Sequence, residues 1–164
     1  MRIIGYQKDN LRNSMEITTQ IISLIADLQQ DNPNFLLCGS CALILNGLLE
    51  NRDVSDIDFV TNHISIQDCK LSLVKDTYSD LNKEDGYMSF SCHYISNGYD
   101  YKINVLVFED TIELNSENLS FLNIFNIKQQ KLEDIINWKE KYNRPKDIMD
   151  LENITLRAIE KAML

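Results

Sequence analysis

Apolar residues recur at helical spacing in the N-terminal part of the chain and again near its C-terminus. In residues 13–30 they stand three or four positions apart, which is typical of one face of an amphipathic helix capped by Asn13 or Ser14. The same spacing in residues 124–163 predicts two more helices, separated where Pro145 interrupts the pattern. One helix is therefore expected before the middle of the chain and two after it.

The middle of the chain carries short apolar runs and alternating patterns that are typical of strands. Two runs rich in aromatic and β-branched residues are separated by Asn97-Gly98, which favours the positive φ angles of a tight hairpin turn. Gly47 ends a short apolar helix that follows the first strand. The predicted elements are strands at 35–38, 57–61, 87–96 and 99–108, and helices at 40–46 and 67–77.

Together these elements predict one α/β (α+β) domain over residues 1–164, with a short mixed sheet flanked by helices. Its core is expected at 35–110, with an N-terminal helix at 13–30 and the C-terminal helices at 124–163. The chain is 44% hydrophobic and 25% charged, which is close to the globular norm, and its 5 glycines and 2 prolines leave no room for a low-complexity linker.

The chain is acidic, with a formal net charge of -9, so a sequence-independent nucleic-acid site is disfavoured. A nucleotide triphosphate would need Mg²⁺ and local cations to offset this charge. No run approaches the ~20 apolar residues that span a bilayer, and no secretion signal is evident. These patterns predict a cytoplasmic or phage-associated protein that is neither secreted nor bound to a membrane.

Two short motifs carry candidate chemistry. Gly39-Ser40 lies where the first strand meets a helix, so backbone N–H groups and a hydroxyl are available to an anion such as phosphate. Asp56 and Asp58 alternate along the second strand and share one face, with Ile57 opposite. Side-by-side carboxylates repel unless a cation holds them, and metal-assisted phosphoryl transfer uses this arrangement.

Gly39-Ser40, a short helix, Arg52, Ser55 and the Asp56-Ile57-Asp58 sequence resemble the nucleotidyltransferase superfamily. The resemblance is to small bacterial and phage proteins related to abortive-infection toxins and minimal nucleotidyltransferases. A second match, Arg144-Pro145-Lys146-Asp147-Ile148-Met149-Asp150, resembles the Lys-Asp-x-x-Asp motif on the C-terminal helix of the toxin-like branch. The resemblance spans residues 35–152.

The resemblance implies the nucleotidyltransferase fold and transfer of a nucleotidyl group from NTP to a hydroxyl acceptor, which in such families is tRNA, a protein or a small molecule. Asp56 and Asp58 would bind two Mg²⁺. The residues expected to contact the nucleotide are Gly39, Ser40, Arg52, Lys139 and Lys146. For Arg144, Asp147 and Asp150, helix capping and helix-surface charge are an equally economical interpretation.

The sequence departs from the family pattern at two places. A lengthened loop is expected at residues 48–53. Asn104 stands where the family places its third carboxylate, and an amide cannot act as a general base. The alternative to an active transferase is therefore a pseudoenzyme that serves as a binding or structural module in a toxin–antitoxin pair, a phage particle or another assembly.

The cysteines suggest two further hypotheses. Cys38 and Cys41 form a Cys-x-x-Cys pair at a strand-to-helix junction, where thioredoxin-like proteins place a redox pair, but no proline suited to face it is evident. A zinc site would need the four cysteines together with His63 and His93, and the chain has no second close pair. Both hypotheses rank below the nucleotidyltransferase prediction, and the two histidines are expected on the surface or in the sheet.

Overall fold

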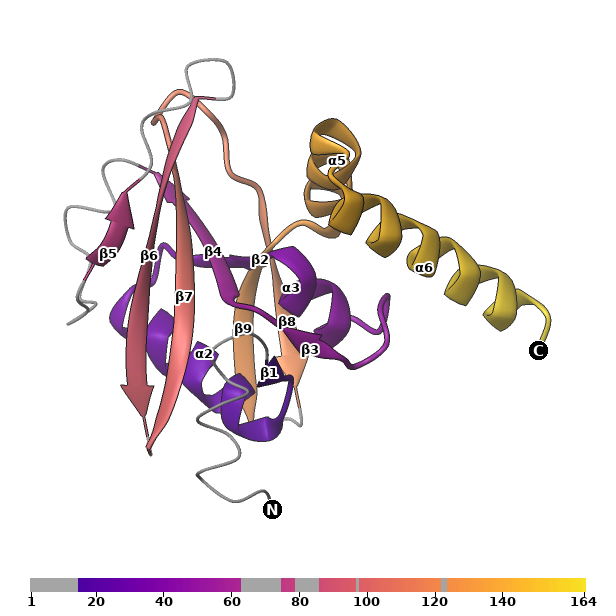
Figure 1. Ribbon diagram of the computed structural model, residues 1–164, viewed down its shortest axis with the longest axis horizontal. Coiled ribbons are helices and arrows are strands. Elements are labelled where there is room, and N and C mark those ends of the chain that lie inside the picture. Colours follow the sequence, from indigo (N-terminus) through magenta and orange to yellow (C-terminus); the bar gives the residue numbers. More distant parts are fainter. Residues whose placement is uncertain (1–14, 63–74, 79–85, 97, 122–123) are drawn as a thin grey trace.

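A mixed sheet forms the centre of the domain (Figure 1). The computed structural model describes residues 15–62, 75–78, 86–96, 98–121 and 124–164. Within that part of the chain the sheet has seven strands in the order β5-β6-β7-β4-β2-β9-β8. Its strands are β2 (Leu36–Cys38), β4 (Ile57–Asn62), β5 (Lys75–Tyr78), β6 (Tyr87–Ser96), β7 (Tyr99–Phe108), β8 (Ser116–Phe121) and β9 (Phe125–Gln130).

The centre of the sheet mixes parallel and antiparallel pairs. β4 lies antiparallel to β2 and parallel to β7, while β2 is also parallel to β9. The predicted hairpin of β6 and β7 is confirmed, with Tyr87 opposite Phe108 and Ser96 opposite Tyr99. The predicted strands at 35–38 and 57–61 are confirmed as β2 and β4, and the short helix after β2 is α3 (Gly39–Leu45).

The two faces of β4 and β7 differ in character. Ile57, Phe59, Ile103 and Val105 have no exposed surface and form the core face of these strands. The alternate residues include Asp58 and Asn104, which are only half-buried and point to the opposite face. Because side chains alternate along a strand, the same backbone supplies both a packed core and a polar surface.

The N-terminal helix is shorter than predicted. Helix α2 (Thr19–Asp31) begins after its cap Thr18, whose hydroxyl accepts a bond from the N–H of Ile21. The preceding residues form β1 (Met15–Glu16), which pairs with β3 (Asp53–Val54). Backbone pairing with β3 thus replaces the first helical turn, and the predicted loop at 48–53 ends in this strand. The predicted caps, Asn13 and Ser14, lie outside the described residues.

The segment before the C-terminal helices was predicted wrongly. Residues 125–130 form β9 in the sheet rather than helix, so the core extends beyond 110. The pattern was misleading because Gln129 is buried in this strand, where it receives a bond from Asn46 and donates one to Glu117. Residues 75–77 of the helix predicted at 67–77 also belong to a strand, β5, and residues 67–74 lie outside the described part.

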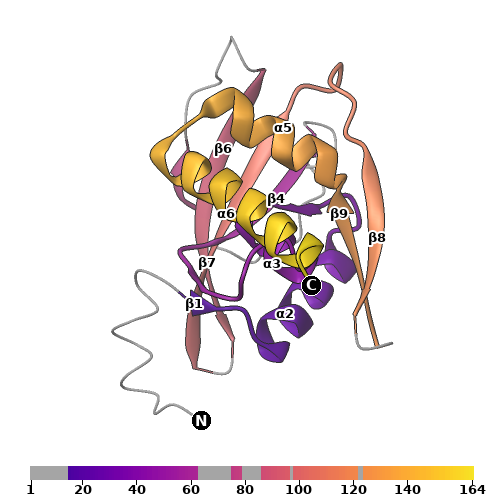
Figure 2. The same ribbon diagram turned by 90° about the vertical axis from the view of Figure 1, so that its right-hand side faces the viewer.

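The C-terminal helices are confirmed as α5 (Leu132–Tyr142) and α6 (Pro145–Ala162). Asn143 adopts a left-handed conformation that ends α5, and Pro145 begins α6. Figures 1 and 2 show both helices on the same side of the domain, with α6 extending away from the sheet toward the C-terminus. Of the helices in the described ranges, none is long and apolar enough to cross a membrane.

Candidate functional site

The polar residues of β4 and β7 meet in one row across the sheet. Asp58 lies opposite Asn104 of β7 and opposite Cys38 of β2. The Asn104 amide donates a hydrogen bond to the Asp58 carboxylate at 3.2 Å, while Ser91 of β6 donates to the Asn104 carbonyl oxygen at 3.3 Å. Ser91 therefore orients Asn104 so that its N–H group faces the carboxylate.

Gly39 brings the start of α3 against this row. Its φ angle is +67°, and a Cβ atom at this position would lie 2.4 Å from Oδ2 of Asp58. Any side chain at position 39 would therefore be strained and would collide with the carboxylate. Glycine permits the strand-to-helix turn and the carboxylate to touch directly.

Two adjoining cavities open at this row. Measured by total empty space, which includes space open to solvent, the larger has a volume of about 810 Å³. The smaller has a volume of about 560 Å³. The residues that line both are Ser40, Asp56, Asp58 and Lys146. Asp56 and Asp58 thus stand where the two cavities meet.

The ionised form of the Asp58 side chain is electrostatically unfavourable in the absence of a cation. Burial, reinforced by the nearby Asp56 carboxylate, raises its pKa from 3.8 to about 7. Lys146, the bond from Asn104 and Lys139 oppose this shift without cancelling it. An additional positive charge at this row would remove the cost of ionising Asp58.

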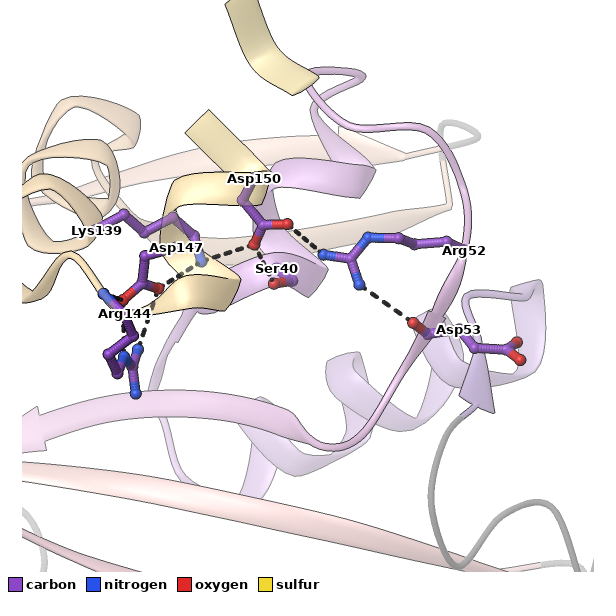
Figure 3. A network of polar contacts seen from close by, with 7 residues as sticks. All are labelled: Ser40, Arg52, Asp53, Lys139, Arg144, Asp147 and Asp150. Carbon is purple, nitrogen blue, oxygen red and sulfur yellow. Dashed lines mark hydrogen bonds and ion pairs between the residues drawn. The ribbon is translucent and has the colours of Figure 1, made fainter. Parts of the chain in front are cut away.

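Helix α6 is joined to the site by a buried ionic network (Figure 3). Asp150 is 2% exposed, and its carboxylate accepts bonds from Ser40 at 3.0 Å, Arg52 at 2.5 Å and Lys139 at 2.9 Å. These donors come from α3, the segment before β3, and α5. One carboxylate therefore connects four parts of the chain behind the cavities.

Asp147 forms the second half of this network. It is fully buried, accepts two side-chain bonds and one backbone bond from Arg144, and lies 3.5 Å from the Lys139 ammonium. Burial alone would raise the pKa of both Asp147 and Asp150. The bonds from Arg144 to Asp147, and those from Lys139 to Asp150 with help from Arg52 and Ser40, instead hold both values below the usual range.

A solved structure with a similar fold is that of a Thermotoga maritima protein described as a putative nucleotidyltransferase. It matches with a TM-score of 0.55 over 84% of this chain and 92% of the other, at 18% sequence identity. The protein has the nucleotidyltransferase fold. The predicted fold class is therefore confirmed.

Two Helicobacter pylori structures, one also described as a putative nucleotidyltransferase, match with TM-scores of 0.43 and 0.41. Their identities to this chain are 19% and 16%, and the matches cover 73% and 75% of it. This chain spans only 53% and 59% of their lengths. No protein-family model matches the sequence, and no curated protein matches it either.

The nucleotidyltransferase fold places most of the predicted site residues around the two cavities. Asp56, Asp58, Asn104 and Gly39 lie at their junction or on the wall of the larger one. The remaining predicted nucleotide contacts are Ser40, Arg52, Lys139 and Lys146. Of these, Lys146 has an exposed side chain, whereas Ser40, Arg52 and Lys139 all donate to Asp150.

One part of the sequence interpretation is wrong. Asp147 and Asp150 are not helix-surface charges, because both are buried in the network. The capping prediction holds for Arg144 and Asp147, which form a capping box at the start of α6. The signal available in the sequence was the three-residue spacing of the two aspartates, which places them on the same helical face as the contacts with α5.

An aromatic wall lines one side of the larger cavity in this protein and was not predicted from the sequence. This wall is made of Tyr87, Phe108, Trp138 and Tyr142, from β6, β7 and α5. The centroids of the ring pairs in contact lie 4.7 to 6.3 Å apart. The rings come from distant segments, so no local sequence motif predicts that they come together.

Cys38 and Cys41 do not have the properties of a redox pair. Cys38 and Cys41 are buried and free, and burial, reinforced by Asp58, raises the pKa of each thiol. A redox pair needs the opposite shift, because the thiolate is the reactive form. No cluster of three or more acidic, histidine or cysteine side chains suited to a metal occurs among the described residues. His93 lies on the exposed part of β6 beside Asp100, as predicted, and His63 falls outside the described ranges.

We expect Asp58→Asn to stabilise the metal-free protein above neutral pH. The folded state binds the Asp58 proton more tightly than the unfolded state, so stability falls as pH rises from about 4 to 7 and stays low above it. Removing the ionisable group should raise the free energy of unfolding at pH 8 by about 1–2 kcal/mol, after allowance for solvent screening.

Denaturant unfolding at a series of pH values measures this effect. Asp27→Asn, an exposed position on α2, is the matched control and should leave the pH profile unchanged. Added Mg²⁺ should stabilise the native chain and not Asp58→Asn. Parallel pH profiles for the native chain and Asp58→Asn would contradict the expectation.

Proposed function

We propose that the protein binds a nucleoside triphosphate with Mg²⁺ and transfers its nucleotidyl group to a hydroxyl of an acceptor. The observation that supports this most strongly is that Asp56 and Asp58 both lie at the junction of two cavities, with Asp58 directly against the Gly39 turn. A transferase needs two substrates to meet at one reacting centre, and this junction provides such a place.

The donor groups suit Mg²⁺. Mg²⁺ is commonly held by one or two carboxylates together with phosphate oxygens of the substrate, so a third acidic ligand is not required. Asp56 and Asp58 would hold it, and the raised pKa of Asp58 is consistent with a site that lacks a positive charge. Bound there, Mg²⁺ would supply positive charge to the phosphates and to the departing group.

The chain itself would bind and orient the substrates. Lys146 lines both cavities and brings a positive charge to the carboxylate row. In the reaction, the acceptor oxygen would bond to the α-phosphorus while the bond to pyrophosphate breaks, and pyrophosphate would leave. Asn104 can orient groups but cannot take the acceptor's proton, which must therefore pass to another base.

A second candidate, a pseudoenzyme, is favoured by one observation. The Asn104 N–H group donates to Asp58, in the place of a third carboxylate that would repel it. This bond stabilises Asp58 without adding a catalytic base, as a nucleotide-binding or structural module would require. Such a module would act with a protein partner in a toxin–antitoxin pair or a phage or other assembly.

Calorimetry and a transfer assay test these candidates. We expect the native chain to bind at least one of the four ribonucleoside triphosphates in Mg²⁺ but not in EDTA. We also expect it to move label from an α-labelled triphosphate to a tRNA or protein fraction, at least 100-fold faster than Asp58→Asn. If the native chain binds no nucleotide while Asn104→Asp gains transfer, the active-enzyme candidate is rejected in favour of the pseudoenzyme.

A further inference from the structure

The larger cavity changes character along the strands that form its floor. Beyond the row of Asp58 and Asn104 lies an apolar row of Val60 and Leu106, which are direct partners in the β4–β7 pair. The next row contains Phe108, opposite Tyr87 of β6. Because each row advances by about 6.6 Å along a strand, the aromatic row begins about 13 Å from the carboxylates.

Helix α5 completes an aromatic wall over this far row. The Trp138 ring meets Phe108 nearly edge-on, with 5.0 Å between centroids, and lies 4.7 Å from Tyr142 at a tilt of 34°. Tyr87 contacts both α5 rings. All four rings line the cavity, and Tyr87, Trp138 and Tyr142 are only half-buried. The wall therefore presents ring surface to a ligand as well as holding α5 on the sheet.

Polar side chains also line the larger cavity. The Arg144 guanidinium lies 5.8 Å from the centre of the Tyr142 ring and lines the same cavity, as do Gln130 and Lys139. A flat ring with apolar faces and a polar edge matches this chemistry, because aromatic stacking tolerates any such ring. A ligand that fits the whole cavity would therefore carry a polyanionic group at the row of Asp58 and a planar ring two rows farther along the strands.

We propose that the aromatic wall of Tyr87, Phe108, Trp138 and Tyr142 is the binding site for the nucleobase of the substrate. This inference rests on the proposed function and adds a second anchor to it. The ribose would cross the apolar row of Val60 and Leu106, which offers no hydrogen-bond donors of its own. The base would stack against the half-buried rings.

Trp138 is the single tryptophan of the chain, so its fluorescence reports on this wall directly. We expect at least one ribonucleoside triphosphate, titrated with Mg²⁺, to quench or shift the emission, after correction for absorption with free tryptophan. Inorganic tripolyphosphate with Mg²⁺ should bind by calorimetry and leave the emission unchanged. The matching nucleoside without phosphates should also change the emission, at higher concentration.

Tyr142→Leu tests the same site by affinity. Loss of one stacking ring should weaken binding of the nucleoside triphosphate by roughly 5- to 150-fold and leave the affinity for tripolyphosphate within twofold. Tyr99→Leu is the matched control, because Tyr99 packs against Tyr101 of β7 and does not line the cavity. It should change neither affinity. If Tyr142→Leu fails to fold, the fluorescence of the native chain decides.

The outcomes separate this inference from the proposed function. Equal affinities for nucleoside triphosphate and tripolyphosphate, with unchanged Trp138 emission, would overturn the nucleobase site and leave the triphosphate site standing. Absence of any Mg²⁺-dependent binding of tripolyphosphate would overturn the proposed function. In that case, a nucleoside that still changes the emission would support the ring site alone.

Discussion

Replacing Asp150 by alanine is expected to lower the free energy of unfolding by about 3–5 kcal/mol, the cost of removing one partner from a buried ion pair. Three donors lose their acceptor together, and Lys139, which is 4% exposed, keeps only the longer contact to Asp147. In a domain of this size such a loss corresponds to a decrease in melting temperature of roughly 6–20 °C.

Thermal and denaturant unfolding measure this loss. The matched control is Glu152→Ala, an exposed position on the same helix, which should change stability by less than about 0.5 kcal/mol. The pH dependence supplies a second readout. The pKa of Asp150 is held low, so its contribution is present above pH 4 and is lost as pH falls through the lower folded value. The stabilities of the native chain and of Asp150→Ala should therefore converge in acid. Equal stabilities of the two at pH 7 would contradict the role of the network.

Gly39→Ala is expected to disrupt both folding and the proposed phosphate site. The left-handed conformation costs an alanine roughly 1–2 kcal/mol, and the new Cβ would collide with Asp58, which adds about 1–3 kcal/mol of overpacking. Because Asp58 must move, Mg²⁺-dependent binding of tripolyphosphate should weaken by at least tenfold, measured by calorimetry.

Gly47 offers a close control. It has a φ of +72°, and a Cβ there would meet nothing within 4 Å. Gly47→Ala should therefore show the conformational cost alone and keep full affinity for tripolyphosphate. The difference between the two variants isolates the contact with Asp58. If Gly39→Ala and Gly47→Ala lose the same stability and the same affinity, the direct contact between Gly39 and the Asp58 carboxylate has no functional role.

The dipeptide motifs and the strand pattern could be predicted from the sequence because they depend only on neighbouring residues. Two-residue alternation predicts that Asp56 and Asp58 point the same way, and both line the two cavities. Asn97-Gly98 specifies its turn through its own φ preferences. Gly39 likewise marks the junction of β2 and α3 in the sequence itself. Each of these depends on residues within a few positions of one another.

The wrong predictions concern residues whose structure depends on contacts with distant segments of the chain. β9 has a polar pattern, yet it is an inner strand because β2 offers a parallel partner and Gln129 finds side-chain partners. Residues 15–16 became a strand because β3 was available to pair with them. In both cases, hydrogen bonding to a remote strand outweighed the local preference.

By itself, the sequence determined the fold class, the hairpin, the C-terminal helices and the pair of carboxylates that face one way, since periodicity and turn chemistry act between neighbours. Only the tertiary structure decided that Asp150 is a buried acceptor for three donors and that four rings from three elements form one wall. Burial and cavity shape are properties of segments brought together, and no pattern within a single segment contains them.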